Sequence, residues 1–99
     1  NDIENVYWVV GILILNKKMT ATKFRDELKK YKIETREFFW PMNKQDALKK
    51  YNLKLNKSYK NSEYISKYGL YLPSGLGTSD KDINYVCKCV KRIKNKFNF

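Results

Sequence analysis

Apolar and polar positions divide the chain into segments of different period. After a polar stretch over residues 1–5, residues 6–15 (VYWVVGILIL) contain no charged side chain. This run is too short for the roughly 18–20 apolar residues that span a bilayer. Its β-branched and aromatic content predicts a strand that is buried on both faces. The polar turn Asn16–Lys18 ends the strand.

A helical period follows this turn. Thr20 is a suitable N-cap, and apolar side chains then recur on one helical face, whereas the charged ones fall largely outside it. The apolar set is Ala21, Phe24, Leu28 and Tyr31, and the outer set is Lys23, Asp26, Glu27, Lys29 and Lys30. We predict a helix that ends near Tyr31. Residues 33–39 then alternate between apolar and polar, which predicts a second strand, and Trp40-Pro41 stops it.

The second half of the chain is more polar and contains shorter elements. We expect helical turns within residues 46–51, a helix over 62–68 ended by Gly69, a strand over 70–73 and a glycine loop over 74–78. Ser79 and Asp82 resemble a capping box, which predicts the start of a last helix. Its apolar face would consist of Ile83, Val86, Val90, Ile93 and Phe97, with lysines on the outer surface.

These elements predict an α+β fold with about three strands, in a mixed or antiparallel sheet, covered by two main helices. Residues 1–5 are interpreted as a linker and residues 6–99 as a single domain. A chain of 99 residues, 42% of them hydrophobic, is sufficient for one modest core but not for two domains. Because it begins with Asn1, we expect it to be part of a longer protein.

The formal charge of +11 raises the possibility of nucleic-acid binding, because phosphates are neutralised by cations. Only Arg25, Arg36 and Arg92 among the 21 basic residues are arginines. Arginine binds phosphates and base edges with a bidentate fork, whereas lysine is a hydrated point charge. The composition therefore favours a solvated lysine-rich surface, with nucleic-acid binding as the alternative.

The residues needed for a self-sufficient active site are absent. There is no histidine, which excludes histidine-dependent triads and histidine metal sites. Cys87 and Cys89 lie two apart on a predicted helix, where they do not face each other, and two cysteines do not complete a zinc site. The glycine loop leads into a helix N-terminus whose N–H groups could hold a phosphate, but it matches neither a P-loop nor a dinucleotide-binding fingerprint, and a structural loop is favoured. We assign no catalytic residue and no metal ligand.

The segment 34–41 (ETREFFWP) contains the most chemical information. Arg36 lies close to three consecutive aromatic residues and a proline. An arginine beside rings can hold a phosphate or carboxylate next to a stacked ring. The structural alternative, in which the three rings are core residues and Arg36 is a surface cation, is equally consistent with the sequence.

Three ordered motifs resemble one protein family. They are residues 6–13 (VYWVVGIL), residues 33–42 (IETREFFWPM) and residues 68–75 (YGLYLPSG), followed by a last helix entered through Thr78-Ser79-Asp80. Together they resemble the C-terminal domain of the DegT/DnrJ/StrS aminotransferases, most closely the perosamine-synthase branch. The resemblance covers nearly the whole chain. It implies the small domain of a fold-type I aminotransferase.

The resemblance also implies a function. The family uses pyridoxal phosphate (PLP) to aminate a nucleotide-linked keto-deoxy-sugar, a precursor of cell-surface polysaccharide, with glutamate as the expected amino donor. The implied parent enzyme is a cytoplasmic homodimer that does not span a membrane. Its Schiff-base lysine belongs to a large N-terminal domain, so none of the 18 lysines here is assigned that role, and this part alone is expected to bind no cofactor and to be inactive.

Five residues are implied to contact the sugar nucleotide. Arg36, Phe38 and Trp40 lie in the motif that approaches the active site, and Tyr7 and Trp8 are weaker candidates. Family members often carry a histidine after the aromatic–proline step, where this chain has Asn43, which leaves the role of that position open. Two alternatives remain: a small basic module that binds nucleic acid or another polyanion, and an interaction domain whose apolar strand face pairs with a partner.

Overall fold

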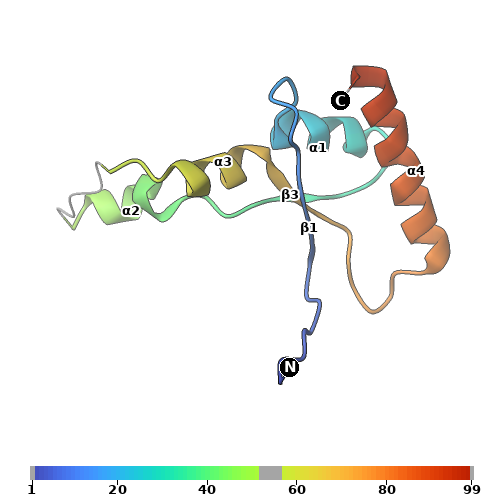
Figure 1. The fold of residues 1–99 in the computed structure, drawn as a ribbon, viewed down its shortest axis with the longest axis horizontal. Helices are drawn as coiled ribbons and strands as arrows, with labels where there is room; N and C mark the ends of the chain where they lie inside the picture. Colours follow the sequence, from blue (N-terminus) through green and yellow to red (C-terminus); the bar gives the residue numbers. More distant parts are fainter. Residues whose placement is uncertain (1, 52–56, 99) are drawn as a thin grey trace.

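The computed structural model describes residues 2–51 and 57–98 and confirms the α+β class (Figure 1). The elements, in chain order, are β1 (Val10–Leu13), α1 (Ala21–Lys29), β2 (Arg36–Glu37), a 3₁₀ turn η1 (Met42–Lys44), α2 (Asp46–Lys49), α3 (Lys60–Tyr68), β3 (Gly69–Leu72) and α4 (Asp80–Phe97). The predicted order of strands and helices is therefore correct, and the polar turn after β1 lies where the sequence places it.

The sheet is antiparallel, and its central strand is the last of the three in sequence. The strand order is β1-β3-β2, with Val10 opposite Leu72 and Arg36 opposite Tyr71. Both outer strands are shorter than predicted, because residues 6–15 and 33–39 contribute only four and two strand residues. The reason is that β3 has four residues, so it offers few backbone groups with which a longer strand could pair.

The prediction that residues 6–15 form a strand buried on both faces is wrong. Ile14 is buried, but Leu15 and Trp8 are 76% and 74% exposed, and Val10 is half exposed. α1 contacts β2 and β3, and no second layer covers the opposite face within the described residues. A strand in a two-layer arrangement can bury only one face. The sheet therefore leaves an apolar surface open.

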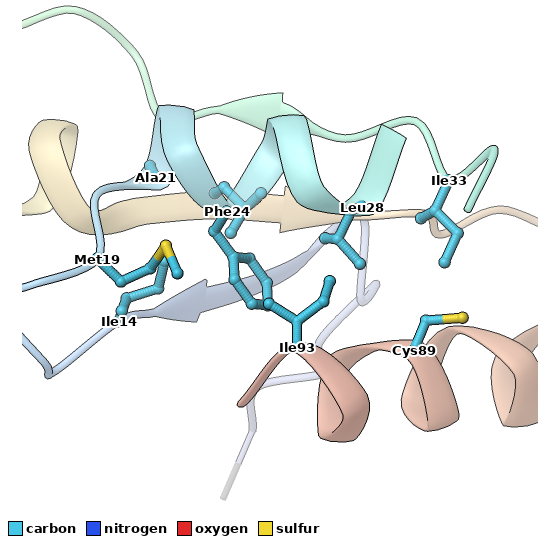
Figure 2. Close-up of a cluster of buried hydrophobic side chains, with 9 residues drawn as sticks. Ile14, Met19, Ala21, Phe24, Leu28, Ile33, Cys89 and Ile93 are labelled. Atoms are coloured by element: carbon cyan, nitrogen blue, oxygen red, sulfur yellow. The ribbon is translucent and has the colours of Figure 1, made fainter. Parts of the chain in front are cut away.

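The core is organised around α1, which contacts β2, β3, α3 and α4. Ala21, Phe24 and Leu28 are buried, as the helical period predicts. They pack with side chains from the segment before α1, the segment after it, β3 and α4, and Figure 2 shows this cluster. The cluster comprises Ile14, Met19, Ala21, Phe24, Leu28, Ile33, Leu70, Cys89 and Ile93. Helix α4 thus packs against α1 and completes the core.

The helix ends follow the local sequence signals. Thr20 Oγ1 accepts a hydrogen bond from the backbone N–H of Lys23 at the start of α1. Ser79 and Asp82 form the predicted capping box at the start of α4, and the pKa of Asp82 is lowered, first by the hydrogen bond from the Ser79 side chain. Each cap satisfies backbone N–H groups that the first helical turn leaves unpaired.

The face of α4 differs from the prediction at two positions. Ile83 is half exposed, whereas Cys89 is buried in the core and Cys87 is exposed. Val86, Val90 and Phe97 pack at the margin of the core. Figure 2 shows Cys89 and Ile93 of α4 facing the side of α1 that carries Phe24 and Leu28, whereas Ile83 does not belong to this cluster. Cys89 therefore acts as a small apolar core residue.

The prediction that Glu27 points away from the packed face is also wrong. Glu27 is 9% exposed and lies where α1 meets α4. Its carboxylate accepts hydrogen bonds from Lys30 on α1 and from Lys96 on α4, the latter at 3.3 Å. The hydrogen bond from Lys30, followed by the contribution of Lys96, holds the pKa of Glu27 below its ordinary value of 4.5. Two ammonium groups thus compensate for burial of the charge.

The overall shape is extended for a chain of this size. The radius of gyration is 16.3 Å, against about 13 Å for an independent domain of 100 residues. In Figure 1 the segment before β1 extends away from the sheet without regular secondary structure. Helices α2 and α3 form an arm on the side opposite α4. The N-terminal segment and the α2–α3 arm therefore extend away from the core.

We predict that replacing Gly69 by Ala destabilises the fold. A Cβ atom at Gly69 would overlap the ring of Phe38 and would lie 2.6 Å from the carbonyl oxygen of Ile65. We expect the free energy of unfolding to fall by about 2 kcal/mol, as for other overpacked sites. Gly77→Ala is the matched control, because a Cβ at Gly77 meets nothing within 4 Å. Equal stability of the two variants in urea unfolding would contradict the prediction.

We also predict an acid-dependent loss of stability that depends on Glu27. A carboxylate whose pKa is lowered by folding stabilises the native state above its unfolded pKa, and this stability disappears as the pH falls. The midpoint of thermal unfolding of the native chain should therefore decrease below about pH 4.5. Glu27→Gln should lower the unfolding midpoint at neutral pH and reduce its decrease at acid pH, here called the acid limb of the midpoint–pH curve. Glu34→Gln, a change at an exposed carboxylate, should leave the acid limb as it is.

Candidate functional site

Two open hollows flank the sheet, and they divide the predicted site residues between them. The first, here called the Arg36 hollow, has a volume of about 780 Å³ and is lined by residues that include Trp8, Arg36, Phe39, Tyr71 and Ser74. The second, the Trp40 hollow, has a volume of about 700 Å³ and is lined by residues that include Phe38, Trp40, Glu63, Tyr64 and Lys67. The five candidates therefore do not form one cluster.

The Arg36 hollow combines a guanidinium group that has no ion-pair partner among the described residues with aromatic rings. The Arg25 guanidinium, which lines the same hollow, is bonded to Glu37 at 2.9 Å and to Asp26 at 3.2 Å. The Arg36 side chain is exposed and has no hydrogen bond or ion pair within the described residues, whereas its backbone pairs with Tyr71 in the sheet. Its cross-strand neighbour is Tyr71, and the ring of Phe39 lies 6.4 Å from that of Tyr71. Arg36 is thus available to an anion beside these rings.

A buried polar atom lies beside Arg36. Thr35 lines the Arg36 hollow, and its Oγ1 atom is buried without a hydrogen-bond partner in the described part of the chain. A buried hydroxyl without a partner costs about 1–3 kcal/mol. A hydroxyl or phosphate oxygen that entered this hollow could remove that cost. Across the hollow, Ser74 Oγ donates to the carbonyl oxygen of Trp8 at 3.4 Å and so connects two of its walls.

Phe38 lines the Trp40 hollow and supports the Arg36 hollow without lining it. Its ring packs against Tyr71 at a centroid distance of 4.4 Å, tilted by 56°. The same ring covers Gly11 and Gly69, where an added Cβ would contact it. The absence of side chains at these two glycines lets Phe38 lie flat on the open face of the sheet. Phe38 therefore fixes the position of Tyr71, which Arg36 faces across the strands.

Trp40 uses its polar atoms locally. Its indole Nε1–H donates to the carbonyl oxygen of Lys44 at 3.0 Å, and its own carbonyl accepts from Gln45 Nε2 at 3.1 Å. These bonds close the turn that contains η1, while the ring remains 59% exposed. Trp40 thus offers a face for stacking in the Trp40 hollow but no free hydrogen-bond donor.

Asn43 has a structural role that the sequence left open. Its Nδ2 donates to the carbonyl oxygen of Lys57 at 3.1 Å and to Glu63 Oε1 at 3.4 Å. Glu63 is also paired with Lys44 at 3.3 Å. The hydrogen bond from Lys44 is the largest cause that lowers the pKa of Glu63, with Asn43 and the backbone of Tyr59 adding to it. Asn43 therefore ties η1 to the start of α3.

Tyr7 lies apart from the other candidates. It lines neither hollow and is 80% exposed. Its φ of 46° places it in the left-handed region, and its N–H donates to Asn5 Oδ1 at 2.8 Å. This Asn–Tyr turn bends the chain just before Trp8. Tyr7 thus influences the direction in which the N-terminal segment leaves the sheet.

Tyr71 is the functional candidate that sequence reasoning missed. It lies between Gly11 and Arg36 in the register of the sheet and lines the Arg36 hollow. Its position in the motif YGLYLPSG carried a signal, since alternation along β3 places Tyr71 on the face opposite buried Leu70. The pairing of β3 with β2, which brings Tyr71 to Arg36, has no signal in the local sequence.

The described part of the chain contains neither a metal-binding cluster nor a membrane-spanning helix. No three histidine, cysteine, aspartate or glutamate side chains within residues 2–51 and 57–98 lie together as a metal ion would require. No helix in these ranges is long and apolar enough to cross a membrane.

Comparison with known proteins identifies a family. The model of the DegT/DnrJ/EryC1/StrS aminotransferase family matches residues 1–91. The matched range includes both hollows, all three strands and most of α4. No curated protein matches the chain.

Proposed function

The chain belongs to the DegT/DnrJ/EryC1/StrS aminotransferase family, and on this premise we propose that it is the C-terminal domain of a PLP-dependent sugar aminotransferase. The parent enzyme would aminate a nucleotide-linked keto-deoxy-sugar of the perosamine type, with glutamate as amino donor. In this proposal residues 1–5 are a linker and residues 6–99 form the domain. The parent is a cytoplasmic homodimer that supplies cell-surface polysaccharide synthesis.

The open surface of the chain supports an assignment as part of a larger enzyme. The radius of gyration of 16.3 Å exceeds the roughly 13 Å of an independent domain of this length. Trp8, Leu15, Phe39 and Met42 are each at least two thirds exposed. Exposed apolar side chains of this size are typical of surfaces that another domain covers. We propose that the large N-terminal domain packs against the surface that carries these exposed side chains.

The residues of this chain do not fit the covalent site of PLP. A lysine that forms an imine with the cofactor needs a burial or charge environment that lowers its pKa. Every lysine whose exposure the structure describes is exposed, and Lys30, Lys44 and Lys96 are paired with carboxylates, so none of the described lysines lies in a buried apolar environment. The proposal therefore assigns the cofactor and all catalytic residues to the large domain.

The observation that carries the substrate proposal is the Arg36 hollow. A sugar nucleotide offers phosphates, hydroxyls and a flat base, and the hollow offers an unpaired guanidinium, the Thr35 hydroxyl and the rings of Trp8, Phe39 and Tyr71. We propose that Arg36 binds a phosphate and that a neighbouring ring stacks on the base or sugar. Phe38 positions Tyr71, and Trp40 and Tyr7 are proposed as contacts at the margin of the site.

We predict that Arg36→Ala in the full-length enzyme weakens substrate binding more than folding. Loss of a charge-assisted hydrogen bond of about 1.5–3 kcal/mol should raise KM for the sugar nucleotide by about 10- to 100-fold. The midpoint of thermal unfolding should change by less than about 2 °C, since the Arg36 side chain is exposed and the change leaves its backbone pairing with Tyr71 in place. Arg92→Ala is the control for the loss of one charge, and its KM should stay unchanged. Unchanged kinetics with a large loss of stability would contradict the proposed role.

We also predict that the 99-residue chain alone forms no specific adduct with PLP. Exposed lysines should give only weak and non-stoichiometric absorbance changes, which no single Lys→Arg substitution abolishes. Titration followed by absorbance spectroscopy and intact-mass measurement after borohydride reduction tests this expectation. A stoichiometric adduct at one lysine would overturn the assignment of the cofactor to a separate domain.

A further inference from the structure

Beyond its first turn, which contains Asp80 and Asp82, the outer surface of α4 carries cations without carboxylates. From Ile83 to Asn98 the helix contains Lys88, Lys91, Arg92, Lys94 and Lys96 and no aspartate or glutamate. Helix α1 differs, because Asp26 and Glu27 lie among its cations and pair with them. We call the exposed set Lys88, Lys91, Arg92 and Lys94 the α4 cationic face. These four side chains are all exposed.

The charges of this face are not neutralised within the described residues. Lys96, the fifth cation, is paired with Glu27, and Glu27 is already bonded to Lys30. None of the four residues of the α4 cationic face has an ion pair in the described part of the chain. The residues also lie three or four positions apart, so that like charges are neighbours on the helix and repel each other. A bound polyanion would relieve this repulsion.

Aromatic rings border the cations. Tyr85 is half exposed and its hydroxyl donates to the carbonyl oxygen of Tyr31 at 3.2 Å. The Arg92 guanidinium lies 5.9 Å from the centre of the Tyr31 ring. Lys96 lies 5.0 Å from the centre of the Phe97 ring, at the other end of the same seam between α1 and α4. Cations alternating with rings are typical of surfaces that bind single-stranded nucleic acids.

The distribution of apolar residues favours a nucleic acid over a lipid bilayer as the ligand of the α4 cationic face. An interfacial helix inserts an apolar face among the lipids, but the apolar side of α4 is occupied, with Cys89 and Ile93 buried against α1. The large exposed apolar side chains of Trp8, Phe39 and Trp40 line the two hollows rather than α4. Among the described residues of α4, Ile83 is a half-exposed aliphatic side chain near the start of the helix, so the α4 cationic face offers charge and half-exposed rings but no continuous apolar face to insert.

We propose that the α4 cationic face binds single-stranded nucleic acid without sequence preference. Lys88, Lys91, Arg92 and Lys94 contact phosphates, and Tyr85 stacks on a base. Three of the four cations are lysines, which act as point charges and do not distinguish base edges. This inference is independent of the proposed aminotransferase function, because it uses a different surface.

The test compares two triple variants of the 99-residue chain that lose the same charge. The first replaces Lys88, Lys91 and Lys94 by Gln, and the second replaces Lys50, Lys57 and Lys60, which are exposed on the arm formed by α2 and α3 (Figure 1). Binding to fluorescein-labelled oligo(dT) and oligo(U) of about 20 nucleotides is measured by anisotropy at two salt concentrations. Circular dichroism confirms that both variants are folded.

We expect the first variant to raise Kd at least about tenfold and to reduce the salt slope by about 2, which corresponds to the loss of three phosphate contacts on a single strand. The second variant should change Kd by less than about threefold, as expected when only the long-range field is reduced. Tyr85→Ala should weaken binding about tenfold, whereas Tyr85→Phe should retain the ring and the affinity.

Three results would overturn the proposal. The first is an equal loss of affinity in the two triple variants, which would indicate attraction by net charge alone. The second is no change with Tyr85→Ala, which would exclude stacking. The third is tighter binding to vesicles containing about 30% phosphatidylserine than to either oligonucleotide, which would identify the partner as an anionic membrane. A preference for oligo(U) over oligo(dT), or the reverse, identifies the kind of nucleic acid and supports the proposal.

Discussion

The fold depends on burial of the apolar face of α1. Phe24 and Leu28 are almost completely buried, and every large neighbouring element packs on this helix. The sheet cannot substitute for it, because β1 and β3 have four residues each and β2 has two. Isolated strands of that length are not stable in water without a layer packed on them. Helix α1 thus holds in place the strands that carry Arg36 and Tyr71.

The sequence predicted those features that are encoded within one turn or one period. The cap at Thr20, the capping box at Ser79 and the buried face of α1 all follow from residues close to each other in the chain. Features that depend on distant partners were missed. Glu27 was placed outside the packed face because its second ammonium partner, Lys96, lies 69 positions away. The burial of residues 6–15 was overestimated, since an apolar run does not reveal how many layers will cover it.

The same distinction applies to the candidate site. The neighbourhood of Arg36 and aromatic residues is visible in the segment 34–41, and the structure places Arg36 in a hollow with Phe39 and Trp8. The segment does not reveal that Trp40 turns toward the other hollow, because this depends on its hydrogen bond to Lys44. The contribution of Tyr71 arises from strand pairing and from the two glycines that allow Phe38 to support it. The residue types of the site could therefore be predicted from the segment 34–41, whereas the spatial arrangement that brings Tyr71 to Arg36 could not.

The position of β3 at the centre of the sheet has a consequence for the order in which the chain folds. β1 and β2 both pair with β3 and not with each other. The residues of β1, such as Val10, therefore have no strand partner until β3 with Leu72 has been synthesised. At about 5–20 residues per second, the apolar segment before α1 leaves the ribosome several seconds before its partner strand. The hydrogen bonds of α1 are local, but its apolar face is covered only after β3 and α4 have been synthesised. During translation, the N-terminal segment is therefore the part of the nascent chain most exposed to chaperones and to aggregation.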